Sequence, residues 1–218
     1  MRHFLFLALA LPLALSACEN ETTLLTTPVD LSPTADAELL PEMPAADQGI
    51  RARRRMDVDQ LDASMRVVSN GIGWTEINGD GQEVNLFEAL GATLGVPDFV
   101  GRTSEDLTAS VVFEKFLGDA SRSVCSAMVG REMGGPTERV LMKHVSDEDD
   151  WETNPAAVEA NMRYLLLRFH GTNYGPGDPG LEAWTWLFRS SMHDGSTPPL
   201  AWHTLCVALF THPDFYSY

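Results

Sequence analysis

The chain has 218 residues, of which 44% are apolar, and 31 Asp and Glu against 15 Lys and Arg give a formal net charge of -16. This length accommodates one globular domain with at most a small appendage, and the apolar fraction excludes a fully disordered chain. Nucleic-acid binding depends on Lys and Arg that neutralise phosphates, and acidic residues here outnumber them twofold. The charge therefore excludes nucleic acid as a partner.

The N-terminal segment has the organisation of a secretory signal peptide, with the sequence MRHFLFLALALPLALSA. Arg2 and His3 form a short polar start, an apolar run extends from Phe4 to Leu15, and small residues follow. This run is shorter than the ~20 residues that a membrane-spanning helix needs. We therefore predict that residues 1–17 are a signal peptide, which is removed.

The sequence LSAC at 15–18 resembles the lipobox of bacterial lipoproteins. The resemblance implies that the thiol of Cys18 receives a diacylglycerol and that this residue becomes the new N-terminus. Residue 19 is Glu, whereas Asp at this place signals retention in the inner membrane of enterobacteria. The resemblance therefore implies a palmitate-type lipid anchor in the cell envelope, in the outer membrane of a Gram-negative bacterium. The alternative is an ordinary signal peptide followed by an incidental cysteine.

Residues 18–50 contain acidic residues, Thr and Pro, but no aromatic residue, Lys or Arg. Such a segment cannot bury enough apolar surface to offset the entropy lost on ordering, so we predict a disordered, lipidated tether. Basic residues then mark the start of a globular domain over 51–218, and they are Arg51, Arg53, Arg54 and Arg55. Two interpretations of this cluster are an anion site and a cap that pairs with the domain's own carboxylates, and we favour the cap.

The sequence signals for starts and ends of elements in the domain are those of helices. Side chains that cap helices, each followed by apolar residues at helical spacing, predict six helix starts, at Asp57, Asn85, Thr103, Asn154, Asp178 and Thr197. The third helix is predicted to be the longest and to reach Met133, with Gly118 as a candidate break. Because no stretch alternates with period two, we expect an all-α fold, a single compact domain of about six helices.

Two cysteines remain if Cys18 is lipidated, and they are Cys125 and Cys206. The compartment beyond the inner membrane is oxidising, and two cysteines in such a space usually pair. We predict a disulfide between Cys125 and Cys206, which would place the third and last helices side by side. The alternative is two separately buried thiols.

The segment around Glu76, Asn78 and Asp80, closed by Glu88, resembles a calcium loop of the EF-hand or dockerin kind. Oxygen-bearing side chains alternate in it, and a glycine permits a sharp turn. The segment departs from the EF-hand pattern in two ways. Glu76 stands where Asp normally begins the loop, and one extra residue shifts the closing acid to Glu88. The alternative, which we favour, is a polar turn in which Asn85 caps the next helix, with no cofactor. The acidic run 147–150 is interpreted as a solvated loop.

Several common catalytic motifs do not occur in the sequence: the chain has no GxSxG, HExxH, Walker A or CxxCH. Cys125 is expected inside a helix and in apolar surroundings, which do not favour a reactive thiolate. A metal site built on His203 and Cys206 lacks two further ligands at predictable places. His170 is expected at the end of a helix, where its cationic form would be stabilised by the helix dipole.

Two segments resemble planctomycete- and myxobacteria-type cytochrome-associated proteins of unknown function. They are RRRMDVDQLDASMRVV at 53–68 and LAWHTLCVALFTHPDFYSY at 200–218. In the second segment a closing Ser/Thr-x-Pro-Asp/Glu-Phe signature falls on 211–215. Without CxxCH the resemblance does not extend to haem attachment. It implies exported or cytochrome-type protein partners, and the apolar tail 210–218 is expected to pack on the core rather than to serve as a free docking arm.

We therefore expect a non-enzymatic lipoprotein, anchored to the membrane through Cys18, that acts as an interaction or assembly module of the cell envelope. The alternatives are a calcium-dependent binding module built on residues 76–88 and an enzyme whose carboxylate site has no recognisable sequence pattern. The features that favour the first expectation are the lipobox, the tether and the acidic helical domain.

Limited proteolysis tests the predicted boundary. The first cuts are expected between Glu19 and Arg51, because a segment without a core is accessible to proteases. A resistant fragment of roughly 165 residues is expected by mass spectrometry, since the domain begins near residue 51. First cuts within 104–170 would contradict the boundary.

Overall fold

The computed structural model describes residues 54–95, 107, 109–135, 138–193 and 195–218. All of them belong to one structural unit, which covers Leu39–Tyr218. The predicted signal peptide at 1–17, the predicted tether at 18–50 and the lipidation candidate Cys18 lie outside the described residues.

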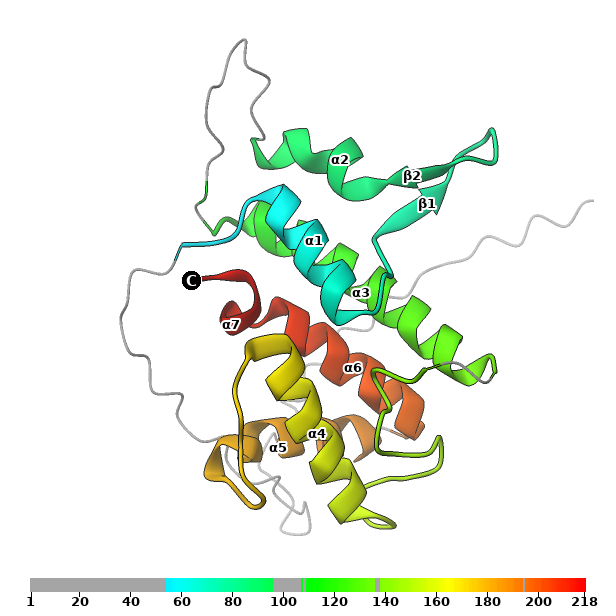
Figure 1. Cartoon of the computed structure of the whole chain (residues 1–218), viewed down its shortest axis with the longest axis vertical. Coiled ribbons are helices and arrows are strands. Elements are labelled where there is room, and N and C mark those ends of the chain that lie inside the picture. Colours follow the sequence, from blue (N-terminus) through cyan, green and yellow to red (C-terminus); the bar gives the residue numbers. More distant parts are fainter. Residues whose placement is uncertain (1–53, 96–106, 108, 136–137, 194) are drawn as a thin grey trace, which may run out of the picture. The chain divides into compact units, whose positions relative to one another are not determined.

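Helices make up most of the described chain, as the sequence predicts (Figure 1). The α-helices are α1 (Val58–Val68), α2 (Leu86–Leu90), α3 (Val111–Met133), α4 (Pro155–His170), α5 (Glu182–His193), α6 (Pro198–Thr211) and α7 (Pro213–Tyr216). Two 3-10 helices, η1 (Gly91–Leu94) and η2 (Pro179–Leu181), lie among them. The prediction of an all-α domain is confirmed. Among the described residues, the one α-helix beyond the predicted six is the short α7.

Local capping decides where most helices begin. Asp57 and Gln60 form the predicted capping box at α1, in which the Asp57 carboxylate accepts from the Gln60 N–H and the Gln60 side chain accepts from the Asp57 N–H. Asn154 caps α4, and Gly171 ends that helix in the left-handed region at a φ of 69°. Asp178 caps only the 3-10 turn η2, and α5 begins at Glu182, after that turn.

The start of the longest helix differs from the prediction. The capping pattern predicts a start at Thr103, which lies outside the described residues, whereas α3 begins at Val111. Ser110 is its N-cap, and the Ser110 hydroxyl accepts the Phe113 N–H at 3.2 Å. Thr and Ser are both good N-caps, and the sequence pattern did not distinguish between them. The helix runs through Gly118 without a break.

A small hairpin was not predicted. Strands β1 (Thr75–Ile77) and β2 (Glu83–Asn85) pair antiparallel, with Glu76 opposite Val84. Each strand has three residues, so neither shows enough alternation to stand out in the sequence. Asn78 shapes the turn, since its side-chain oxygen accepts the N–H groups of Asp80 and Gln82 at 3.0 and 2.9 Å.

Helix α6 lies at the centre of the helices and contacts α3, α4, α5 and α7 (Figure 1). Half of its fourteen residues are buried, including Trp202, Leu205, Leu209 and Phe210. The prediction that the last long helix faces the core is confirmed. The expectation that the tail packs on the core is also confirmed, because Phe215 of α7 is buried against Phe210, with ring centroids 4.9 Å apart.

A disulfide joins Cys125 of α3 to Cys206 of α6, as predicted. The two Cα atoms are 5.9 Å apart, and both side chains are fully buried. The alternative of two separate thiols is therefore wrong.

Within the described ranges, none of the helices combines the length and the apolar character that a membrane span requires.

Removal of this crosslink is expected to destabilise the domain strongly. The cysteines are 81 residues apart, and closing a loop of this length stabilises a protein by about 4 kcal/mol in the chain-entropy treatment. We expect the double variant Cys125→Ser/Cys206→Ser to lose about this free energy of unfolding, measured by urea denaturation. The Cys18→Ser variant is the control and is expected to unfold like the parent. Equal stability of parent and double variant would contradict the assignment.

Candidate functional site

The four residues of the candidate calcium loop lie on different parts of the hairpin region. Glu76 is on β1, Asn78 and Asp80 are in the turn, and Glu88 is in α2. The side-chain oxygen of Asn78 already accepts two backbone N–H groups. Asn85 caps α2 by accepting the Phe87 N–H at 3.0 Å, as the favoured alternative predicts. Among the described residues, these acids do not belong to any group of three or more ligand side chains that converge.

The acidic run 147–150 shapes the loop before α4. Asp147 pairs with Arg139 at 2.7 Å. The Asp149 carboxylate accepts the backbone N–H of Ser146, which is the main reason that its pKa lies below the usual range. Bonds from the N–H and hydroxyl of Thr153 lower the pKa of Asp150. These carboxylates stabilise turns, which agrees with their interpretation as a loop.

The buried carboxylate of Glu132 holds a main-chain segment. Glu132 is 3% exposed, and its two oxygens accept the N–H groups of Val140, Leu141 and Met142 at 2.6 to 2.8 Å. Asn161 holds the same segment from α4, since it donates to the Leu141 carbonyl at 2.8 Å. These contacts satisfy the backbone where no helix does so, which gives Glu132 a structural role.

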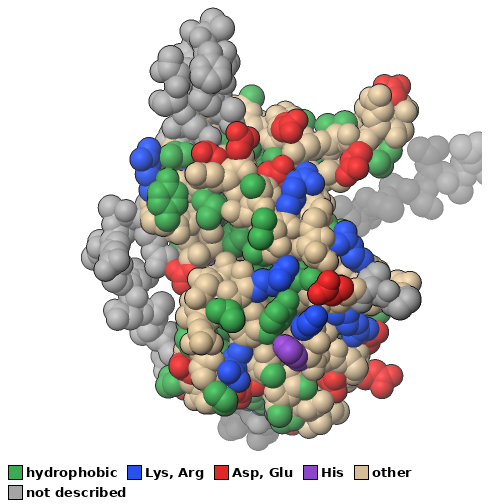
Figure 2. Space-filling view, viewed as in Figure 1, with side chains coloured by type: hydrophobic (Ala, Val, Ile, Leu, Met, Phe, Trp, Pro, Cys, Tyr) green, Lys and Arg blue, Asp and Glu red, His purple; other side chains and the backbone are tan. Residues whose placement is uncertain are grey.

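The arginines of the described chain bind the fold itself. Arg55 is 3% exposed, and its guanidinium lies 4.7 Å from the ring centroid of Phe113, so it is not available to a solvent anion. Arg51 and Arg53 lie outside the described residues. Lys and Arg side chains gather near the middle of one face (Figure 2). Arg168 donates to the carbonyls of Val67 and Val68, at the end of α1.

Ser126 of α3 and His203 of α6 form a side-chain hydrogen bond between these helices. The Ser126 hydroxyl lies 3.1 Å from Nε2 of His203, and the same nitrogen lies 3.4 Å from the Arg122 carbonyl. A carbonyl only accepts, so Nε2 carries a proton when it binds there and cannot then act as a base toward Ser126. Cys206 is held in the disulfide, which removes it as a metal ligand together with His203.

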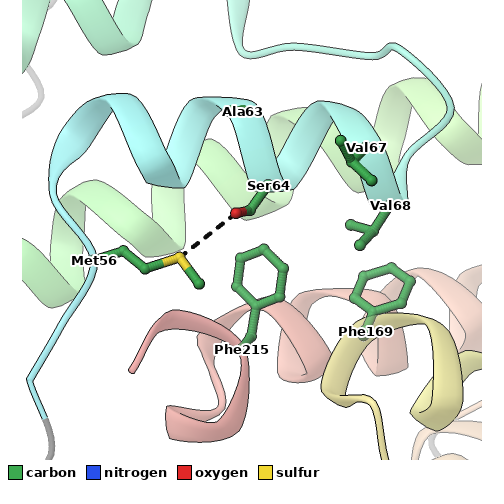
Figure 3. Close-up of a pocket in the computed structure, with 7 residues that line it drawn as sticks. All are labelled: Met56, Ala63, Ser64, Val67, Val68, Phe169 and Phe215. Carbon is green, nitrogen blue, oxygen red and sulfur yellow. Dashed lines mark hydrogen bonds between the residues drawn. The ribbon is translucent and has the colours of Figure 1, made fainter. Parts of the chain in front are cut away.

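An apolar pocket opens between α1 and the two aromatic rings that face it from α4 and α7 (Figure 3). It is lined by Met56, Ala63, Ser64, Val67, Val68, Phe169 and Phe215. Its volume is about 300 Å³, at the lower end of the range for small-molecule sites. Val67 is 73% exposed. Most of the residues that line the pocket are apolar.

Two histidines and an aspartate converge where α4 ends and α7 begins. One ring nitrogen of His170, one of His212 and a carboxylate oxygen of Asp214 all lie within 4.8 Å of one another. Among the described residues, this is the only such group of three or more His, Cys, Asp or Glu side chains. The two imidazoles stack with centroids 4.9 Å apart, and the Trp184 ring lies 5.5 Å from each. These three side chains form the candidate functional site, called the His-His-Asp site below.

Burial governs the protonation of His170. It lowers the pKa of this imidazole below 6.5, and the nearby His212 lowers the pKa further. The Leu209 carbonyl lies 2.9 Å from Nε2, and because a carbonyl only accepts, Nε2 carries the proton and Nδ1 keeps its lone pair. His170 is the last residue of α4, as predicted, but burial lowers its pKa and so favours the neutral imidazole over the expected cation.

Sequence reasoning did not find the His-His-Asp site. His212 and Asp214 are close in sequence and appear in the tail signature, but His170 precedes them by about 40 residues. The local signal was a short His-Pro-Asp stretch, in which Pro213 opens α7 and the His212 ring accepts the Asp214 N–H at 3.2 Å. A histidine at a helix N-cap is uncommon, so His212 was the residue that could have indicated a site at this place.

The lowered pKa of His170 predicts acid sensitivity. The unfolded chain binds a proton near pH 6.5 and the folded chain only below it, so stability is present above this pH and is lost as the pH falls through the folded-state pKa. Between about pH 7.5 and about pH 5, the parent is expected to lose more free energy of unfolding than His170→Gln, whose amide still donates to Leu209. Urea denaturation with a chelator present measures the difference. Equal losses would show that His170 is not responsible.

No protein-family model, curated protein or solved structure matches the chain.

Proposed function

We propose that the protein is an exported lipoprotein, anchored through Cys18 in the outer membrane of a Gram-negative cell envelope, whose helical domain binds a protein partner. The observation that carries the proposal is the disulfide between Cys125 and Cys206. Structural disulfides persist in oxidising compartments and are rare in the cytosol of mesophiles. The disulfide therefore supports export, which is the step that the signal-peptide sequence at 1–17 would direct.

The distribution of the three cysteines supports the lipid anchor. Two of them are consumed by the disulfide, and the third, Cys18, stands in the lipobox-like sequence at 15–18. Each methylene of an attached acyl chain contributes about 0.8 kcal/mol on burial in the bilayer, and two or more chains are enough for stable anchoring. Basic residues near the anchor are therefore not needed, in agreement with a segment 18–50 that has none.

The geometry of the domain favours binding over catalysis. The buried acid Glu132 and the buried amide Asn161 hold main chain rather than line a cavity. The pocket beside α1 is small, open and mostly apolar, which suits the side chain of an exported or cytochrome-type protein better than a polar substrate. The role proposed for the domain is therefore a non-enzymatic interaction or assembly module.

Replacement of Cys18 tests the proposal. The thioether forms only on a cysteine thiol, so Cys18→Ser is expected to lose metabolic labelling with palmitate and to accumulate as precursor or as a soluble form. The double variant Cys125→Ser/Cys206→Ser is the matched control and is expected to keep the label. If the domain binds a partner at the membrane, crosslinking in intact cells is expected to give adducts with the parent that Cys18→Ser lacks. Equal labelling of Cys18→Ser and parent would refute the lipid anchor.

A further inference from the structure

The His-His-Asp site has the donor set of a metal centre. Imidazole nitrogen and carboxylate oxygen are the ligands that Zn²⁺ and neighbouring divalent transition metals take from proteins, and Ca²⁺ prefers six to eight oxygens. We propose that His170, His212 and Asp214 bind one divalent first-row transition-metal ion, with Zn²⁺ as the ion that fits best. This inference goes beyond the proposed function and does not depend on lipid anchoring.

The distances are close to those that coordination requires. Bonds of about 2.0 to 2.2 Å to a tetrahedral ion hold ligand atoms roughly 3.3 to 3.6 Å apart. Nδ1 of His212 and a carboxylate oxygen of Asp214 are 3.6 Å apart, and no pair in the group exceeds 4.8 Å. A movement of the ligand side chains by about an ångström would bring these atoms to the spacing that a tetrahedral ion requires. His212 and Asp214 can supply it, because their side chains are about 40% exposed and lie at the start of the short α7.

His170 makes the kind of hydrogen bond that metal-binding histidines usually make. Such residues donate the N–H of one ring nitrogen to a carbonyl or carboxylate and bind the ion with the other nitrogen. Here Nε2 of His170 donates to the Leu209 carbonyl at 2.9 Å, which leaves the lone pair on Nδ1. The ring is held between α6, through that bond, and Trp184 of α5, 5.5 Å away. The least mobile ligand is therefore fixed before an ion arrives.

His212 also has a lone pair in position. The N–H of Asp214 donates to Nδ1 of His212 at 3.2 Å, so this nitrogen is unprotonated in that bond. An ion would take this lone pair in place of the N–H, and neither imidazole would have to release a proton. The three protein ligands leave a fourth position for water or for a group from another molecule. Because the ligands come from α4 and α7, the ion would also join the C-terminal helix to the rest of the domain.

Zinc titration of the purified full-length protein, freed of metal with a chelator, tests the proposal by calorimetry. We expect one Zn²⁺ per chain. Asp214→Asn keeps the shape of the side chain, and His212→Asn keeps an acceptor that can cap α7. Each variant is expected to bind Zn²⁺ at least about tenfold more weakly, the lower bound known for loss of even an outer partner of a ligand. The matched control is His193→Asn, which removes an exposed histidine outside the site and is expected to bind like the parent.

Two further measurements make the result specific. Co²⁺ in place of Zn²⁺ is expected to give the visible absorption of a four-coordinate site in the parent and not in His212→Asn. Thermal unfolding without metal is expected to be similar in parent and Asn variants, whereas Zn²⁺ raises the melting temperature of the parent alone. Absence of stoichiometric Zn²⁺ binding would overturn the proposal. Equal affinity in parent, Asp214→Asn and His212→Asn would also overturn it, since the ion would then bind elsewhere.

Discussion

The fold depends on the burial of one strongly apolar helix. Seven of the fourteen residues of α6 are buried, and they form a broad apolar face that other elements must enclose, whereas Leu200 on the opposite side is 51% exposed. α3, α4, α5 and α7 provide that enclosure (Figure 1). Trp202, Leu205 and Phe210 fill the interior that results. The disulfide from Cys206 to α3 then joins the central helix covalently to the longest one.

The His-His-Asp site is a consequence of this arrangement. The last turn of α6 offers the Leu209 carbonyl to His170, and His212 and Asp214, which follow α6 at the start of α7, lie close to the same imidazole. The burial that lowers the pKa of His170 comes from the same packing. The hydrophobic core and the His-His-Asp site therefore depend on the same helix packing. A change in the docking of α4 on α6 would disturb both.

Buried polar groups complete the fold where helices do not reach. The segment 138–145 has no helix of its own to satisfy its backbone, and Glu132 and Asn161 supply acceptors and a donor from the helices on either side. At the other end of the domain, Arg54 and Tyr218 exchange backbone hydrogen bonds, which tie the start of the described chain to its C-terminus. The contacts of Glu132 and Asn161 join a loop to its flanking helices, and the contact of Arg54 with Tyr218 joins residues that are distant in sequence.

The sequence by itself determined the all-α class, most helix starts and the cysteine pairing. Helix caps act over about four residues, as in the Asp57–Gln60 box, and the predicted domain over 51–218 contains only two cysteines that could pair. Only the tertiary structure decided that His170 meets His212 and that Glu132 holds a loop. The physical reason is that these contacts depend on how the helices dock around α6, and docking is set by side-chain packing over the whole domain rather than by neighbours in the chain.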